Sequence, residues 1–264
     1  MSRIVFLGTG GDVVVLAKQL RSCGGVVIQT SRATVLIDPG PGALAGLANA
    51  GISVRDLTGI LVSHHHVLHC HDVVAVIHAM TLAGEDKHGV LVCSERVLES
   101  VSSFHQSCVE RVVKIQAGKK LAIEDCEIAC VPVVHDDSVG FLLQAPDVVI
   151  GMTGDTLFSR ELLKQYAGVD VLILNTPFLE KPVGHHLCVA DARVLVEKIK
   201  PSLAVLTHFG KNLLDQNPLY RARDVQKETG VRVICAEDGL VVDPAAYDAR
   251  SSQRTLSNFT QARQ

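Results

Sequence analysis

The segment Ser63-His64-His65-His66-Val67-Leu68-His69-Cys70-His71-Asp72 is the most informative part of the chain. These ten residues hold five of the twelve histidines in the sequence. The apolar residues 57–62 before the segment predict a buried strand, and the apolar residues 73–80 after it predict a helix. The histidines therefore lie on a strand-to-helix loop, where α/β proteins commonly place functional side chains.

The spacing of these histidines predicts metal binding. Neutral imidazole is the commonest protein ligand for zinc and related metals. His64 and His66 are separated by one residue, so both side chains can share one face of an extended segment and reach a single ion. His69 on the following turn can then face a second ion. An expression tag would not lie inside the chain between apolar elements, so the cluster predicts a metal site.

The same relationship between a strand end and a polar side chain recurs later in the sequence. A His or Asp follows the predicted strands that end near residues 134, 152 and 206; these residues are His135, Asp155 and His208. Side chains at the ends of several strands converge on one edge of a layered α/β fold. We therefore expect them to join the histidine cluster in space.

These motifs resemble those of the metallo-β-lactamase fold superfamily. Ser63-His64-x-His66-x-x-His69 is similar to the family's His-x-His-x-Asp-His signature, and the later motifs follow in the family's order from Ile4 to about Pro244. The resemblance implies an α/β fold, a four-layer αβ/βα sandwich with two mixed β-sheets face to face and helices outside. It also implies a metal-dependent hydrolase.

The resemblance further implies a role for each matching residue. The implied ligands of a first metal are His64, His66 and His135, and those of a second metal are His69 and His208. Asp155 matches the catalytic carboxylate that bridges the two metals. Asp38 resembles the acidic residue that orients a ligand histidine.

One position departs from the family signature, because the expected Asp is replaced by Leu68. A leucine side chain has no lone pair to offer a metal. The second site is then weak or absent beside one firm site, or Cys70, His71 or Asp72 supplies a replacement ligand, or the pocket binds without hydrolysing. A single metal can still lower the pKa of water to about 7, so the departure weakens the case for catalysis without removing it.

A second motif lies near residue 186. Gly184-x-His186-Leu187-Cys188-x-x-Asp191-Ala192 looks like the His-x-Ser/Thr segment before a helix in phosphodiesterase-type members, including the tRNase Z branch. The match implies that His186 donates a proton or binds phosphate, with His185 as the alternative. Because Cys188 replaces the usual hydroxyl residue, a solvated loop is the competing interpretation.

Composition sets limits on the class of protein. The 264 residues are 47% hydrophobic, and without an internal repeat or linker they predict one domain over residues 1–264, with a polar tail from about Tyr247 that we expect to be frayed. The net charge of −3 does not indicate nucleic acid or an anionic membrane as partner, although a nucleic acid substrate stays open. Eight scattered cysteines and the lack of a signal peptide or apolar span predict a cytoplasmic protein.

The sequence therefore favours a metal-dependent hydrolase of a phosphodiester or related phosphate ester, acting through a water that the metal activates. Zinc is the expected metal, with manganese and iron as alternatives. The alternative functions are hydrolysis of a thioester or lactone, as in glyoxalase-II-like relatives, and non-catalytic binding of a metal or small molecule. A homodimer is left open.

Three further expectations concern local structure. The glycine run 8–11 has neither dinucleotide nor P-loop spacing, so we expect a tight turn near the metal site. Residues 95–105 predict one helix capped by Ser94. The predicted strands 109–115, 120–123 and 126–134 are expected to form the antiparallel half of the second sheet.

Overall fold

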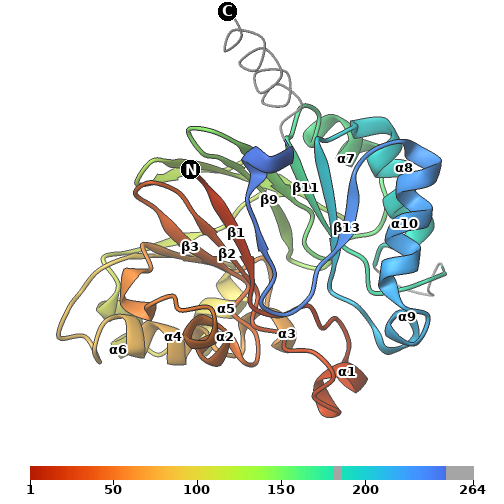
Figure 1. Ribbon diagram of the computed structural model, residues 1–264. Coiled ribbons are helices and arrows are strands. Elements are labelled where there is room, and N and C mark those ends of the chain that lie inside the picture. The colour runs from red at the N-terminus through yellow and green to blue at the C-terminus, as the bar shows by residue number, and fades with distance from the viewer. Residues whose placement is uncertain (181–185, 248–264) are drawn as a thin grey trace, which may run out of the picture.

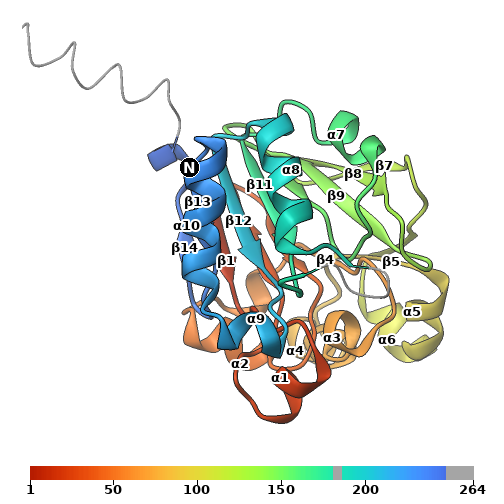
Figure 2. The ribbon, with the colours of Figure 1, turned by 90° about the vertical axis from the view of Figure 1, so that its right-hand side faces the viewer.

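Two mixed β-sheets of seven strands each form the centre of the computed structural model, which describes residues 1–180 and 186–247. The sheets lie face to face, and helices cover the outer face of each (Figures 1 and 2). The predicted αβ/βα sandwich is therefore confirmed. The expected frayed tail after Tyr247 lies outside the described residues, as does His185.

The first sheet combines the N-terminal half of the chain with the last strand, in the order β14-β1-β2-β3-β4-β5-β6. Its strands are β1 (Arg3–Phe6), β2 (Val26–Gln29), β3 (Thr34–Ile37), β4 (Gly59–Leu61), β5 (Val90–Cys93), β6 (Arg111–Lys114) and β14 (Val241–Val242). β2 and β3 form an antiparallel hairpin, and β3 to β6 run parallel.

The second sheet has the order β13-β12-β11-β10-β9-β8-β7. Its strands are β7 (Lys120–Ile123), β8 (Cys126–Pro132), β9 (Val139–Gln144), β10 (Val149–Met152), β11 (Val171–Asn175), β12 (Leu203–Thr207) and β13 (Val233–Cys235). β7 to β10 are antiparallel, and β10 to β13 are parallel. The carboxyl ends of β10, β11 and β12 therefore meet at one edge.

Helices pack on both outer faces. The first sheet is covered by α2 (Ala43–Asn49), α4 (Val73–Met80), α5 (Glu95–Ser100) and α6 (Ser103–Cys108), and the second by α7 (Arg160–Gln165), α8 (Val189–Ile199) and α10 (Pro218–Thr229). Three short helices lie toward one end of the sheets: α1 (Val13–Ala17), α3 (Val67–Cys70) and α9 (Lys211–Asp215). Two 3₁₀ turns are Val54–Asp56 and Pro244–Tyr247. Within the described ranges, no helix has the length and apolar character needed to span a bilayer.

Three hydrophobic clusters join these four layers. Ile4 and Phe6 of β1 point to the cluster between the sheets, whereas Val5 and Leu7 point to the cluster beneath the helices of the first sheet. This alternation follows from the two-residue period of a strand. The third cluster fills the space between the second sheet and its helices. Burial of this apolar surface holds the sheet edges, and hence the loops beyond them, in place.

Two local predictions were wrong. The strand at 109–115 is β6 of the first sheet, parallel to β5, because the helices between them act as a crossover connection. The predicted helix 95–105 is two helices. Ser94 caps α5 as expected, but Val101 is extended and the Ser102 side chain accepts a hydrogen bond from the His105 backbone N–H, which starts α6.

Candidate metal centre

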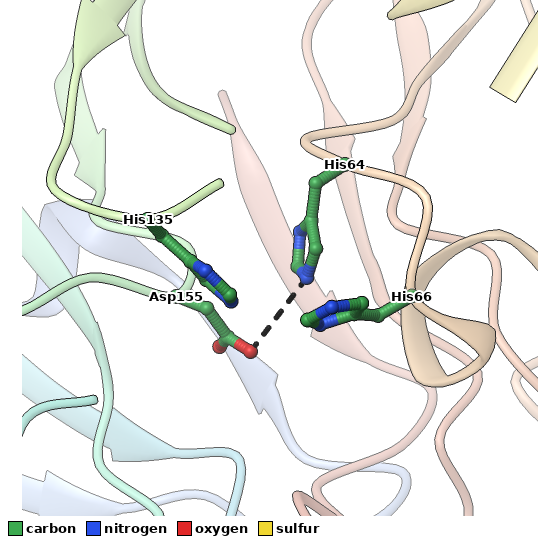
Figure 3. A group of neighbouring side chains, drawn as sticks. All are labelled: His64, His66, His135 and Asp155. Carbon is green, nitrogen blue, oxygen red and sulfur yellow. Dashed lines mark ion pairs between the residues drawn. The ribbon is translucent and has the colours of Figure 1, made fainter. Parts of the chain in front are cut away.

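Four side chains from the loops after β4, β8 and β10 form the first donor group. His64, His66, His135 and Asp155 each offer a ligand atom, and these atoms all lie within 4.8 Å of one another. Figure 3 shows the four side chains pointing toward a common point, with His64 Nε2 lying 3.8 Å from Asp155 Oδ2. The structure thus brings together residues that lie up to 91 positions apart in the sequence.

A second donor group shares the same carboxylate. The ligand atoms of His69, Asp155 and His208 also lie within 4.8 Å of one another. His69 Nε2 is 3.2 Å from Asp155 Oδ2, and His208 Nε2 is 3.4 Å from Asp155 Oδ1. All three side chains are buried. Asp155 therefore lies where one carboxylate can serve both groups.

Asp38 and Ser63 hold one histidine of each group. The Asp38 carboxylate accepts hydrogen bonds from His69 Nδ1 at 2.9 Å, from the Ser63 backbone N–H at 2.6 Å and from Ser63 Oγ at 2.8 Å. Ser63 Oγ in turn accepts from His64 Nδ1 at 2.9 Å. Both rings therefore use Nδ1 as a donor and direct Nε2 into the site. The sequence motif gave no role to Ser63.

The donor atoms fit a divalent cation. His64 Nε2 is buried and has no hydrogen-bond partner, and His69 Nε2 faces the shared Asp155 carboxylate at 3.2 Å. A buried polar atom without a partner is costly, so His64 Nε2 calls for a group that binds there. Imidazole nitrogens with a carboxylate oxygen are donors that zinc, iron and manganese accept. The residues present therefore suit a metal.

Burial and charge set the protonation of these groups. Burial lowers the pKa of His135 to about 4 and also lowers that of His64, so both rings are neutral lone-pair donors at neutral pH. Burial acts to lower the pKa of His69 too, but the carboxylates of Asp155 and Asp38 outweigh it and raise this pKa to about 10. In the metal-free protein a proton on His69 thus balances these carboxylates, and a bound cation can take over that role.

Asp155 is ionised because neighbouring histidines stabilise its negative charge. Burial acts to raise its pKa, but His208 and His69 hold this pKa well below its usual range. An ionised carboxylate is the form that binds a cation.

The glycine run lies against His208. His208 has φ of 61°, in the left-handed region. Its neighbour Phe209 forms a parallel bridge with Gly10, and the Gly11 N–H donates to the Phe209 carbonyl at 2.9 Å. A Cβ on Gly11 would lie 2.0 Å from the His208 carbonyl oxygen. Glycine is therefore required for this close approach, which seats His208 in the second group.

Leu68 lies beside the second group without replacing its missing ligand. It lines a small cavity of about 20 Å³ together with His69 and His208. This volume has room for about one water molecule. An apolar residue therefore lines the cavity where the family signature has an aspartate.

The suggested replacement ligands lie elsewhere, so that interpretation was wrong. Cys70 Sγ donates to the carbonyl of His65, and the exposed His71 ring pairs with Asp72 at 2.8 Å. The other Asp72 oxygen accepts from the backbone N–H groups of Gly42 and Ala43 at the start of α2. None of the three belongs to either donor group among the described residues.

His186 reaches the same carboxylate from the segment that precedes α8. Its Nδ1 lies 3.5 Å from Asp155 Oδ2, and its ring centroid is 5.3 Å from that of His135. The segment is anchored by a bridge between Phe178 and Cys188. The Cys188 thiol also forms a capping box with Asp191 at the start of α8. The thiol thus fills the capping position of the usual hydroxyl residue.

Asn175 is a residue of the site that sequence reasoning missed. It is the last residue of β11 and is buried, and its Nδ2 donates to Asp155 Oδ1 at 2.9 Å. Its position at a strand end could have indicated a role, because β11 lies between the two strands that precede the predicted ligands Asp155 and His208. An asparagine at a strand end also suits an ordinary turn, so its residue type alone did not indicate a role.

Comparison with known proteins gives the family of the chain. A model of the β-lactamase superfamily domain matches residues 33–209. The uncharacterised protein MJ1374 of Methanocaldococcus jannaschii is 32% identical over 252 residues, covering 91% of this chain and 94% of that protein. A ribonuclease Z of Saccharolobus solfataricus is 22% identical over 268 residues, covering 81% of this chain and 91% of the relative.

Solved structures share the fold. The metallo-β-lactamase fold protein YhfI from Bacillus subtilis superposes with a TM-score of 0.77 at 15% identity, covering 91% of this chain and 98% of that one. A diphosphatase from the PhnP family gives a TM-score of 0.69 at 20% identity, covering 91% and 96%. At these identities the likeness speaks for the fold alone.

Proposed function

The chain belongs to the β-lactamase superfamily and has the metallo-β-lactamase fold of metal-dependent hydrolases, and from this premise we propose that it hydrolyses a phosphodiester or a related phosphate ester. The observation that carries the proposal is the position of His186. Its Nδ1 lies 3.5 Å from the carboxylate shared by both donor groups, so a titratable ring faces the site that would hold the reacting ester.

The first donor group would hold the metal. His64, His66, His135 and Asp155 supply three nitrogens and one oxygen, a set that suits zinc and also accepts manganese or iron. When bound, such a cation lowers the pKa of a water molecule to about 7 and polarises the bond under attack. We expect one tightly held ion per chain, because Leu68 leaves the second group without its own carboxylate.

The protein's own residues would act on the substrate around this ion. His186 is partly exposed, so substrate can reach it. In its protonated form it can donate a proton to the leaving oxygen or hydrogen-bond a charged phosphoryl oxygen. Asp155 would help hold the ion, and its Oδ2 lies 3.5 Å from the Nδ1 of His186.

The relatives support a phosphate ester as substrate, since one is named a ribonuclease and one structural neighbour a diphosphatase. The net charge of −3 supports a small phosphodiester over a long polyanion. A second candidate function is non-catalytic binding, which is favoured by Leu68 in the cavity wall beside His69 and His208.

One assay set separates these functions. The purified protein, loaded in turn with zinc, manganese and iron, would be given bis-p-nitrophenyl phosphate, an RNA and a thioester. We expect phosphodiester turnover that a chelator abolishes and that metal restores. Turnover of the thioester alone would move the assignment to the glyoxalase-II-like alternative, and metal binding without any turnover would favour the binding protein.

A further inference from the structure

We propose that Asn175 is a positioning residue that reserves one oxygen of Asp155 and so, together with the uncharged Leu68, restricts the centre to a single tightly bound divalent cation. The inference rests on the metal binding in the proposed function and adds the residue that sets how many ions the site holds. It concerns occupancy, so it can be tested without any assay of hydrolysis.

The topology places Asn175 between the two donors it affects. β11 lies between β10 and β12 in the second sheet. Asp155 follows β10, His208 follows β12, and Asn175 ends β11, where it pairs in register with Thr207. Strands on both sides therefore fix the Asn175 backbone, and its side chain is buried.

The hydrogen bond from Asn175 makes the two carboxylate oxygens of Asp155 unequal. Asp155 Oδ2 lies near both groups, at 3.8 Å from His64 Nε2 and 3.2 Å from His69 Nε2. Asp155 Oδ1 lies near His208 and accepts the Asn175 amide at 2.9 Å. A second ion would therefore share Oδ2 with the first and would meet an N–H donor beside Oδ1. The positive end of an N–H dipole disfavours a cation there.

Charge balance points the same way. Asp155 is the only acidic residue in the donor groups formed by the described residues, and Asp38 is the carboxylate hydrogen-bonded to His69 behind them. The negative charges of these two carboxylates balance one divalent cation. A second divalent cation would leave a buried excess of positive charge, which is costly. Asn175 and Leu68 both line the cavity beside His69 and His208, and both are uncharged. The neutral amide is therefore part of what holds the site to one ion.

Asn175→Asp replaces the donor by a carboxylate of nearly the same shape. We expect the variant to retain two ions per chain after dialysis, and its cobalt(II) form to show magnetic coupling between neighbouring ions. Asn175→Ala should still bind one ion, but about tenfold to a hundredfold more weakly, which is the usual effect of losing an outer hydrogen-bond partner. Elemental analysis gives the ion count, and competition with a chelator gives the affinity.

The exposed Asn49 provides a matched control, since Asn49→Asp adds the same charge away from the site and should keep one ion at wild-type affinity. Two tightly held ions in the wild-type protein would overturn the inference, as would an Asn175→Asp that folds and holds one ion. If Asn175→Asp does not fold, wild-type affinity in Asn175→Ala overturns it. One tight ion with these variant effects but no hydrolysis would leave the inference standing and remove the proposed function.

Discussion

The Asp38 carboxylate accepts a hydrogen bond from His69 Nδ1 at 2.9 Å, and through Ser63 Oγ it also reaches His64. One buried carboxylate therefore orients a histidine from each donor group. Asp38 itself has φ of 53°, a left-handed backbone that non-glycine residues seldom adopt. Its backbone N–H donates to Leu61 at the end of β4, which holds this conformation in place.

Asp38→Asn should weaken metal binding about tenfold to a hundredfold. The amide is uncharged and has an NH₂ donor in place of one acceptor oxygen, so at least one of the hydrogen bonds from Ser63 and His69 is lost. Competition with a chelator measures the affinity, and Asp56→Asn on the exposed Val54–Asp56 turn is the matched control. Unchanged affinity in a folded Asp38→Asn protein would show that the two rings hold their orientation without this carboxylate.

Ser63→Ala separates the two branches of this network. The Asp38 to His69 hydrogen bond remains, but His64 Nδ1 loses its acceptor. We expect metal affinity to fall about tenfold. Ser63→Thr, which retains the hydroxyl, should keep the affinity near that of the wild type. Equal losses in the two variants would instead indicate a packing effect at this fully buried position.

His186→Ala should lower phosphodiester turnover by about a hundredfold or more and leave the metal content unchanged, because the ring lies beside the donor groups and is not a member of them. Steady-state kinetics and elemental analysis on the same preparation test both parts. His71→Ala removes an exposed imidazole from the neighbouring segment and should change neither quantity. A loss of metal from His186→Ala would make His186 a ligand.

The convergence of the histidines and Asp155 was predictable because candidate metal ligands have a restricted residue type and these residues follow strand ends. Asn175 and Ser63 occupy equally specific positions, but asparagine and serine are common at strand ends for other reasons. Their roles depend on which strand lies next to which, and this is decided by long-range packing. Long-range packing also explains the wrong prediction for β6. Its residues predict a strand, but they do not indicate which sheet the strand joins. The break between α5 and α6 depended on a local cap at Ser102 that the apolar pattern concealed.

Asp125 gives a stability prediction with a defined pH range. Burial acts to raise its pKa, but hydrogen bonds from the Ser31 and Thr30 side chains outweigh this and lower it. A lowered folded-state pKa adds stability above the unfolded value of 3.8, and this stability is lost as the pH falls through the folded value. Asp125→Ala should therefore reduce the free energy of unfolding by roughly 1 kcal/mol at pH 7, on the scale of a net hydrogen bond.

The difference between wild type and Asp125→Ala should shrink as the pH falls below 3.8, because the wild-type carboxyl then becomes protonated. Urea unfolding at several pH values measures it. Glu127→Ala removes an exposed carboxylate on the neighbouring β8 and should show no such trend. A constant difference across the whole pH range would assign the effect to packing.

Leu68→Asp tests whether one side chain separates this centre from one with two ions. Leu68 lines the cavity beside His69 and His208, so a carboxylate there can reach the second group. It would add the negative charge that a second cation requires, and two ions about 3.5–4 Å apart can stabilise both the attacking and the leaving oxygen. We expect a higher metal content after dialysis and faster hydrolysis of bis-p-nitrophenyl phosphate, with reduced stability of the metal-free protein because an unpaired carboxylate is costly in this wall.

Leu68→Asn has a similar shape without the charge and should gain neither metal nor activity. If the folded Leu68→Asp protein behaves like Leu68→Asn, the second group has lost more than one ligand, and the non-catalytic binding function becomes the better assignment.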